Sequence, residues 1–386
     1  MNKIILHTTT LMIMSISTYA GGTILPDTME NTAPKQVTNN FIKMVNGYMR
    51  LGYQRNNNNQ DLALGGKLHI ETNTWNNLSA GASFYTTNSI KKHEGTGVAF
   101  FDANNHSYTI LGEAYVEGTW DNTTIKMGRQ EISTPFADTD DVGMVPNTFE
   151  AIVLINTDIA NTTLFLAQLQ RWSGVDSDNP DTFTKLNNNN GVQVLGIHYD
   201  GFTNTTLSGW YYHIQDTVKV GYLEANYEVQ NDAFSYALAA QYSLQDYDDN
   251  TQSTIYGLTA SFGLKNSGIT ASIAYNNING KAADNFFGGG PYFTNAEHHT
   301  LSEAGKEGES VLYGLAWDVS SIGIDGLILS ANFDTHTNTT YGDTKEYDIV
   351  VSYDYSDILN FTAIYSDIDD ERDAFTNLRV FVNYSF

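Results

Sequence analysis

The last ten residues of the chain, NLRVFVNYSF (residues 377–386), decide the fold class. Read backwards from Phe386, every second residue is apolar, and only Phe381 interrupts the polar residues between them. Chain ends are usually polar and frayed, whereas strict alternation is typical of a β-strand with one apolar face. Such a strand needs a partner along its edge. We therefore expect it to pair with the first strand of the sheet, near residues 45–53.

The composition favours a large all-β protein. The 386 residues are 41% hydrophobic and only 16% charged, with 24 Tyr, 19 Phe and 32 Gly but 6 Pro and no Cys. Tyr and Phe favour strands, and Gly favours tight turns. Without Cys no disulfide can hold the fold together, so another closing device is needed. Beyond the first twenty residues, no segment offers eighteen consecutive apolar residues for a transmembrane helix.

The first twenty residues, MNKIILHTTTLMIMSISTYA, are typical of a secretory signal peptide that is cleaved before Gly21. Its removal leaves 18 Lys and Arg against 44 Asp and Glu, a net charge of −26. We therefore expect an exported, strongly acidic protein. This charge argues against a nucleic-acid partner, because it repels phosphate groups.

Alternation with a period of two recurs along the whole mature chain. In SYTILGEAYVEGTW (residues 107–120) it predicts a strand with one apolar and one polar face. The apolar face comprises Tyr108, Ile110, Ala114 and Val116, and the polar face includes Glu113 and Glu117. Eighteen such runs begin near residues 43, 61, 77, 107, 121, 147, 160, 190, 204, 217, 233, 253, 267, 310, 325, 343, 358 and 377. No stretch shows a convincing helical period.

The connections between the runs alternate between long and short. Long polar segments follow the third, fifth, seventh and thirteenth runs, whereas WNN, WDN, LKNSG and GIDG are tight turns. Bacterial transmembrane barrels have an even number of strands, short periplasmic turns and long outer loops, and their closure satisfies every backbone hydrogen bond. We predict an all-β transmembrane antiparallel β-barrel of about 18 strands over residues 43–386, preceded by a periplasmic tail over residues 21–42.

Charges and aromatic rings divide between the two faces of this barrel. Trp75, Trp120, Tyr384 and Phe386 lie at the ends of runs, where rings favour the membrane interface; the alternative is that they fill a soluble core. The positions opposite the apolar ones line the predicted lumen and comprise Arg50, Lys67, Glu71, Glu113, Glu117, Lys126, Glu150, Glu224, Asp318, Asp334, Glu346, Asp348 and Arg379. This excess of acids over bases predicts a pore that prefers cations.

The stretch KMGRQEISTPFADTDDVGMVPNTFEA (residues 126–151) resembles the segment around the third outer loop of OprD-type outer-membrane porins. The resemblance lies in Gly-Arg-Gln at the end of one strand and Pro-Asn-Thr-Phe-Glu at the start of the next. It implies an outer-membrane location and a third outer loop that folds into the lumen and narrows it, with Asp138, Asp140 and Asp141 at the constriction. It also implies that the barrel assembly machinery recognises the aromatic end, Tyr384 and Phe386.

An alternative for this acidic loop is that it stays at the surface and bridges lipopolysaccharide through divalent cations. The chain also departs from the family pattern, because OprD-type channels guide carboxylate nutrients along a ladder of basic wall residues and this chain has only six Arg. Arg129 shares the parity of outward-facing Met127, yet its place at a strand end lets it turn into the lumen. A short ladder remains, comprising Arg50, Lys67, Lys126, Arg129 and Arg379.

The unmatched ring of Phe381 is expected to face the lumen and pack against Pro135 or Phe136 of the inserted loop. We predict passive diffusion of small hydrophilic solutes and ions, without a cofactor. The alternatives are a structural or adhesive barrel and, less favoured, a hydrolase assembled in space. Solute identity stays open, and so does the choice between a monomer and a homotrimer, because lipid and a subunit interface require the same apolar residues.

The sequence carries no motif for catalysis or metal binding. Neither GxSxG nor HExxH occurs, and no third ligand stands at a telling distance from the adjacent His298 and His299. The acidic clusters DSDNPD and DIDDERD lack the register of an EF-hand loop. We therefore predict neither an enzyme nor a metal protein, and leave calcium binding by the outer loops open.

Overall fold

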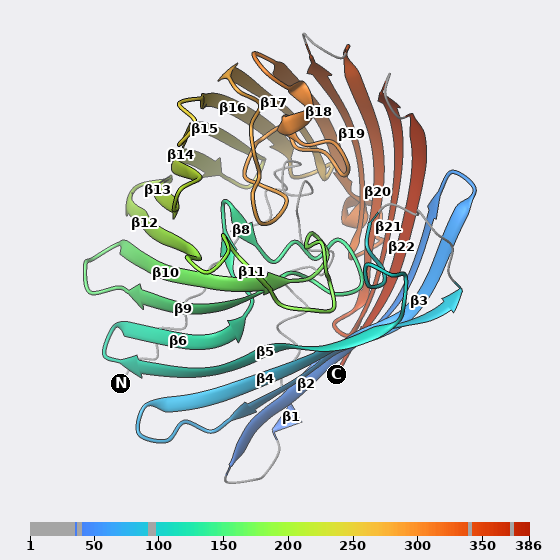
Figure 1. The fold of residues 1–386 in the computed structure, drawn as a ribbon. Coiled ribbons are helices and arrows are strands. Elements are labelled where there is room, and N and C mark those ends of the chain that lie inside the picture. The colour runs from blue at the N-terminus through green and yellow to red at the C-terminus, as the bar shows by residue number, and fades with distance from the viewer. Residues whose placement is uncertain (1–34, 37–40, 92–97, 339–341, 371–373) are drawn as a thin grey trace.

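The chain forms a closed antiparallel β-barrel (Figure 1). The computed structural model describes residues 35–36, 41–91, 98–338, 342–370 and 374–386; the predicted signal peptide and most of the predicted tail lie outside them. Within these residues, eighteen long strands form the barrel wall. They are β2 (Ile42–Asn56), β3 (Asn59–Thr72), β4 (Leu78–Lys91), β5 (Tyr108–Trp120), β6 (Thr123–Gln130), β9 (Thr148–Asn156), β10 (Thr162–Ser173), β12 (Val192–Phe202), β13 (Thr205–Ile214), β14 (Val218–Gln230), β15 (Phe234–Tyr247), β16 (Gln252–Leu264), β17 (Ile269–Gly280), β18 (Glu309–Asp318), β19 (Leu327–Thr337), β20 (Thr344–Ser356), β21 (Leu359–Asp370) and β22 (Phe375–Ser385).

Short elements complete the described structure. Two-residue strands β1 (Lys35–Gln36) and β11 (Thr184–Lys185) pair with β2 and β10, and β7 (Ser133–Thr134) pairs with β8 (Ala137–Asp138). The 3₁₀ turns are η3 (Leu301–Ala304) and η4 (Val319–Ile322). No helix in the described ranges is long and apolar enough to cross a membrane.

The predicted fold is confirmed strand by strand. Each of the eighteen predicted runs begins within two residues of an observed strand, because the period-two signal marks each pleated segment. Turns between strands use Asn or Asp at positive φ, as at Asn76, Asp121 and Asn204, where these short polar side chains tolerate the left-handed conformation.

The final strand closes the barrel, as its alternation predicts. β22 pairs antiparallel with β2 from Tyr48 opposite Ser385 to Asn56 opposite Asn377. The pairing includes the last residue, since the backbone N–H groups of Gly47 and Phe386 each donate to the other's carbonyl oxygen, at 3.1 and 3.0 Å. Tyr384 and Phe386 are 44% and 46% exposed, which leaves both rings on the outer surface of the rim.

The predicted faces hold for most strands but fail in the first half of β5. Tyr108 is partly buried and Ile110 is buried within an interior cluster, so the prediction that they share the outward face of Val116 is wrong. The register between β4 and β5 shifts at Gly112, where β5 carries one extra residue. A bulge of one residue exchanges the two faces of the strand beyond it. Glu113, after the bulge, is buried on the lumen side as predicted.

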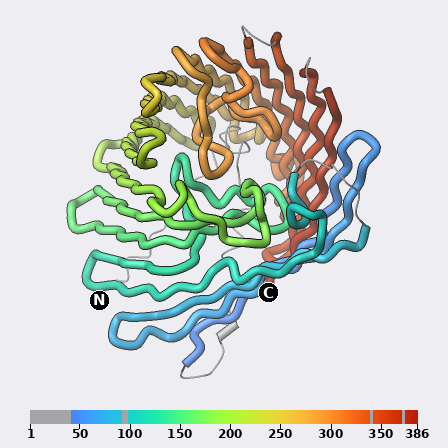
Figure 2. The backbone as a smooth tube through the Cα atoms, in the orientation of Figure 1, coloured from blue at the N-terminus to red at the C-terminus, as the bar shows by residue number. Residues whose placement is uncertain are grey.

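The long connections all lie at one end of the barrel and fold inward (Figure 2). We name them L2 (described part, residues 98–107), L3 (131–147), L4 (174–191) and L7 (281–308). Apolar residues of L3 and L7 pack against β9, β10 and β12–β14 in a first interior cluster, whereas L2 and the end of L3 pack against β3–β5 and β22 in a second. The loops therefore fill part of the lumen.

Candidate functional site

L3 is strapped to the barrel wall by Arg50 on β2. The Nη1 and Nη2 groups of Arg50 donate to Oδ1 and Oδ2 of Asp141, each at 2.6 Å. Nη1 also donates to the carbonyl oxygen of Gly143 at 2.6 Å, and Nε donates to Oδ1 of Asn383 at 2.8 Å. A bidentate pair fixes orientation as well as distance. This fully buried strap brings Asp141 against the seam between β2 and β22 and balances its charge.

The ring of Phe381 lies on the lumen side of the same seam. Its centroid is 5.7 Å from that of Phe100 in L2, and Met144 of L3 belongs to the same buried cluster. Phe381 does face the inserted loop as expected. The expected contact with Phe136 is wrong, because Phe136 and the preceding Pro135 form the far tip of L3 and Phe136 packs in the first interior cluster.

The tip of L3 inserts Phe136 into an aromatic cage. The ring of Phe136 makes edge contacts with four others, at centroid distances from 5.4 to 5.9 Å. Two of them, Tyr212 and Tyr222, come from β13 and β14, and the other two, Phe286 and Tyr292, come from L7. L3 is therefore held from two sides of the lumen.

L3 and L7 are also joined through their backbones. The N–H of Asp138 donates to the carbonyl oxygen of Phe287 at 2.9 Å, and the N–H of Phe287 donates to the carbonyl oxygen of Phe136 at 3.2 Å. These bonds make a parallel bridge between Ala137 and Phe287. The two inserted loops thus form one continuous obstruction.

The three acids predicted at the constriction have different environments. Asp141 is paired with Arg50. Asp140 is buried, and burial together with the nearby Asp176 carboxylate raises its pKa well above its usual range. Asp138 is half-buried, and desolvation raises its pKa to about 6. The charge of Asp138 therefore changes between mildly acidic and neutral pH.

A second group of charges follows strands β3–β5 to the start of L3. Nζ of Lys67 lies 2.8 Å from Oε1 of Glu113 and 2.9 Å from Oε1 of Glu131. The hydroxyl of Tyr85 lies within hydrogen-bond distance of both carboxylates and can donate to either. The predicted lumen residues Lys67 and Glu113 are thus brought together with Glu131 in one network.

Nearer the short-turn end, the predicted wall charges Glu71, Glu117 and Lys126 are spread out along β3, β5 and β6. Nζ of Lys126 lies 3.8 Å from the ring centroid of Tyr115, and Lys126 is opposite Glu117 in the strand register. Glu71 accepts a hydrogen bond from Lys43 at 2.8 Å. Glu71 shares the side of Lys67 in β3, and Glu117 shares the side of Glu113 in β5.

Glu150 does not lie on the predicted lumen face. It alternates with Phe149 and Ala151, which are both buried in the first interior cluster, and it shares the side of Ile152, which is 49% exposed. In β9 the apolar residues face the inserted loops inside the barrel, and the residues that alternate with them, including Glu150, face outward. Nε of Arg129 lies 3.9 Å from Oε2 of Glu150.

Arg129 keeps the parity of outward-facing Met127 and contacts the rim. Its guanidinium lies 4.3 Å from the ring centroid of Phe183 in L4, and its Nη1 donates to the carbonyl oxygen of Leu111 at 3.1 Å. Phe183 packs against the second interior cluster. Arg129 therefore connects L4 to the barrel wall.

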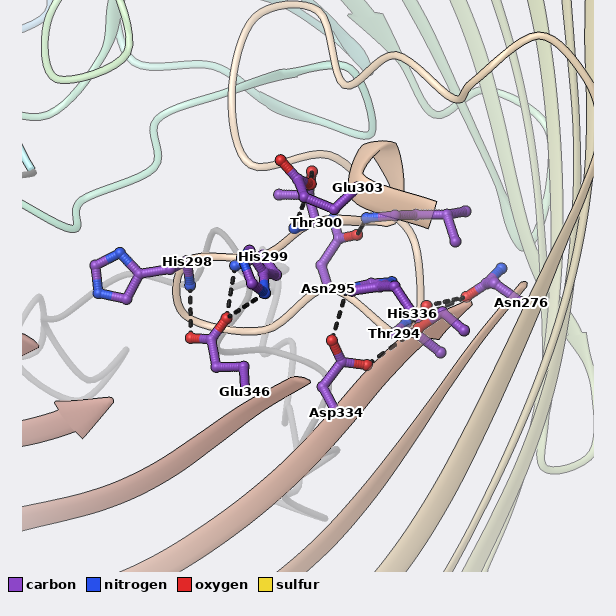
Figure 3. A network of polar contacts seen from close by, with 12 residues as sticks. Asn276, Thr294, Asn295, His298, His299, Thr300, Glu303, Asp334, His336 and Glu346 are labelled. Atoms are coloured by element: carbon purple, nitrogen blue, oxygen red, sulfur yellow. Dashed lines mark hydrogen bonds and ion pairs between the residues drawn. The ribbon is translucent and has the colours of Figure 1, made fainter. Parts of the chain in front are cut away.

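L7 makes contacts with the barrel wall that could not be predicted from the sequence. Nη2 of Arg379 on β22 lies 2.5 Å from Oε2 of Glu297, and both side chains are buried. The carboxylate of Glu346 on β20 accepts the backbone N–H groups of His298 and His299 at 2.9 and 2.7 Å (Figure 3). Arg379 was expected on the wall, but the loop that reaches it has no periodicity from which a contact could be read.

The same region gathers buried titratable groups. Burial and the nearby Asp348 carboxylate raise the pKa of Glu297 to about 7, although Arg379 opposes the shift. Burial and the charge of Arg379 lower the pKa of His298 to about 3. Across the described part of the chain, no group of three or more His, Cys, Asp or Glu side chains is arranged to hold a metal ion.

A closed barrel of eighteen strands narrowed by its own loops defines the class of outer-membrane channel proteins called porins. The chain belongs to the OprD family: the family model described as "outer membrane porin, OprD family" matches residues 87–357. Porins of this family are outer-membrane channels for small solutes rather than enzymes. A search of curated proteins found no match.

Solved structures share the fold at low sequence identity. OpdK of Pseudomonas aeruginosa, solved with vanillate, is 14% identical with a TM-score of 0.78, covering 89% of this chain and 98% of that one. A BenF-like porin of Pseudomonas fluorescens Pf-5 is 15% identical with a TM-score of 0.77, covering 89% and 98%. OccAB4 of Acinetobacter baumannii is 14% identical with a TM-score of 0.76, covering 89% and 97%.

Proposed function

We propose that this porin is a passive diffusion channel for small hydrophilic solutes and ions, that it prefers cations, and that L3 forms its constriction with Asp138, Asp140 and Asp141. The observation that supports the preference for cations is that three basic wall residues form ion pairs with carboxylates of the chain itself. Arg50 is paired with an L3 acid, Lys67 with Glu113 and Glu131, and Arg379 with Glu297. Fixed charges act most strongly on an ion in a narrow, low-dielectric pore.

The acids left over on the wall extend the argument. Glu117 and Glu224 face inward without a Lys or Arg side chain within ion-pair distance among the described residues. A carboxylate solute therefore meets basic groups that are already neutralised, together with a surplus of negative charge. A cationic solute, in contrast, is attracted by the surplus of negative charge.

The purified protein should produce step-like single-channel currents in planar bilayers. In a salt gradient, the reversal potential should carry the sign of cation permeation, because the fixed acids concentrate cations in the pore. Measuring the permeability ratio of potassium to chloride tests this. Anion preference would contradict the proposed selectivity, and the absence of any currents would contradict the channel itself.

The cation preference should rise with pH. The carboxyl of Asp138, whose pKa is about 6, is neutral at a pH well below this value and negative above it. The permeability ratio should therefore increase between pH 5 and pH 7.5, and the increase should be smaller in Asp138→Asn. Asp178→Asn, at an exposed position in L4, is the matched control and should keep it. An equal rise in the Asp138→Asn channel would remove Asp138 from the conduction path.

We propose the remaining partners on similar grounds. The outward apolar residues of the strands suit membrane lipid, and lipopolysaccharide would surround the long-loop rim. Tyr384 and Phe386, exposed at the end of β22, would be read by the barrel assembly machinery. A homotrimer and a monomer place the same demands on this apolar surface.

A further inference from the structure

Two large aromatic side chains lie side by side on the lumen wall. Phe165 on β10 and Trp210 on β13 stand at the same level, because both are paired in register with Gly196 on the strand between them, β12. These three strands are neighbours in the wall (Figure 1). The centroids of the two rings lie 5.4 Å apart. We call Phe165, Gly196 and Trp210 the aromatic strip.

Gly196 makes the aromatic strip possible. A Cβ atom at this position would lie only 2.4 Å from Cζ3 of Trp210. A glycine inside a strand often marks such a close approach of another group. The indole of Trp210 therefore lies across the backbone of β12 and reaches Phe165 on the far side, so the two rings form one continuous apolar surface.

The aromatic strip faces the lumen at the edge of the inserted loops. Leu195 and Ile197, on either side of Gly196 in β12, are 49% and 46% exposed on the outer wall, and successive strand residues point to opposite faces. One pair nearer the long loops, Val194 and Tyr212 are fully covered within the first interior cluster. Both rings of the aromatic strip are only partly buried. The strip is therefore accessible from the short-turn side of the obstruction.

A carboxylate lies one strand from the aromatic strip. Glu224 on β14 is opposite Ser208 on β13, which lies two residues from Trp210 and on the same face. Its Oε2 accepts a hydrogen bond from the hydroxyl of Tyr222 at 2.5 Å, and its Oε1 accepts one from Nδ2 of Asn226 at 2.6 Å. These two bonds fix the position of the carboxylate and use about half of the lone pairs that it offers.

Glu224 keeps its negative charge available to a solute. Its side chain is only partly buried, and within the described ranges it forms no ion pair with a Lys, Arg or His side chain. In this respect it differs from Glu113 and Glu131, which share Lys67. An ammonium group at Glu224 would therefore meet a carboxylate that no cation of the wall neutralises.

The spacing of the two features suits one molecule. Because neighbouring strands lie about 4.8 Å apart, the strand of Glu224 is roughly 5 Å from that of Trp210 and roughly 14 Å from that of Phe165. A flat ring joined to an ammonium group by a short chain thus reaches both Glu224 and Trp210. A larger ring system extends over Gly196 to Phe165.

We propose that the aromatic strip and Glu224 form a binding site for organic cations that carry a flat apolar ring. The ammonium group donates to Glu224, and the ring stacks on Trp210 and Phe165. The site rests on the proposed cation-preferring channel and names a class of solute for it. Neither part selects this class alone, because a carboxylate attracts any cation and an aromatic surface accepts any flat apolar solute.

Three small probes separate the ring from the charge. 2-Phenylethylammonium carries both, ethylammonium carries the charge alone, and phenylacetate carries a ring with the opposite charge. Each is added to both sides of a planar bilayer, and the concentration that halves the potassium current through the channel is measured. For 2-phenylethylammonium this concentration should be at least about tenfold lower than for either of the other probes.

Glu224→Gln tests the carboxylate. The variant removes a charge-assisted hydrogen bond to the ammonium group, so the half-blocking concentration of 2-phenylethylammonium should rise about tenfold. Glu117→Gln is the matched control, because it removes the same charge from the lumen wall on β5, away from the aromatic strip. Its half-blocking concentration should stay near that of the unmodified channel.

Two variants of Trp210 test the ring. Trp210→Leu keeps an apolar side chain but removes the aromatic face, so it should weaken block by 2-phenylethylammonium and leave block by ethylammonium unchanged. Trp210→Phe keeps a flat ring and should retain most of the binding. Potassium currents recorded without a probe show that each variant has folded into a channel.

Each outcome decides the site separately from the channel. Equal half-blocking concentrations for 2-phenylethylammonium and ethylammonium would overturn the site. An equal change in Glu224→Gln and Glu117→Gln, or equal block in Trp210→Leu and Trp210→Phe, would overturn it as well, and in all these cases the porin function stands. A protein without currents, or one that prefers anions in the absence of a probe, would overturn the proposed function on which the site rests.

Discussion

Deletion of residues 133–144 should raise the single-channel conductance several-fold. This segment contains the tip of L3, including Phe136 in its aromatic cage, and the Asp141 carboxylate that binds Arg50. Its removal takes away the inserted part of the obstruction and the contact on which L7 rests. Because the narrowest section limits the current, the wider barrel behind it should then determine the conductance. Single-channel recording in planar bilayers measures the change.

The matched control for this deletion is a shorter one at the same rim. Residues 248–250 form an exposed turn between β15 and β16, so their removal should leave the conductance near its original value. If deletion of residues 133–144 also leaves the conductance unchanged, L3 does not limit the current, and Asp138, Asp140 and Asp141 lose their proposed role at the constriction.

Arg50→Met should release L3 from the wall and destabilise its inserted position. The variant leaves the buried Asp141 carboxylate without its partner, and such a loss typically costs about 3–5 kcal/mol. We expect a lower midpoint of thermal unfolding and larger, noisier single-channel currents. Arg55→Met is the control on the same strand, because the Arg55 side chain is exposed and its replacement should change neither quantity much.

A double variant separates the charge from the packing. Arg50→Met/Asp141→Leu removes both partners, so no unpaired charge stays buried, and replacing both partners of a buried ion pair by apolar residues is often close to neutral. The double variant should therefore recover much of the thermal stability lost in Arg50→Met. Equal losses in the two variants would mean that the loss in Arg50→Met does not come from the unpaired Asp141 charge.

The strands were predictable because each carries its own signal. Alternation, turn residues and loop lengths are local properties, and they located all eighteen strand starts and the closure of β22 on β2. The bulge at Gly112 was not predictable, because one inserted residue leaves no trace in composition while it reverses the face of Ile110. Glu150 was misplaced for a related reason: inserted loops made the inner face of β9 apolar.

The site was predictable only in part. Its acids in L3 could be named from the motif, and Arg50, Lys67 and Arg379 from strand parity. Their partners could not, because Arg50 and Asp141 stand 91 residues apart and Arg379 and Glu297 stand 82 apart. Contacts between an irregular loop and a distant strand follow no sequence period, so the contacts of L7 with the wall were not predicted.

The position of the two arginines at the seam has a consequence for assembly. Arg50 stands on the first strand of the closed barrel and Arg379 on the last, and the Nε of Arg50 reaches Asn383 across their junction. Until these two strands meet, Arg50 lacks one of its hydrogen-bond partners, and the anchors of L3 and L7 stand on strands that are not yet joined. We therefore expect the loops to reach their final positions only after the barrel has closed. Insertion of the obstruction is then the last step of folding, and it depends on the pairing of the first strand with the last.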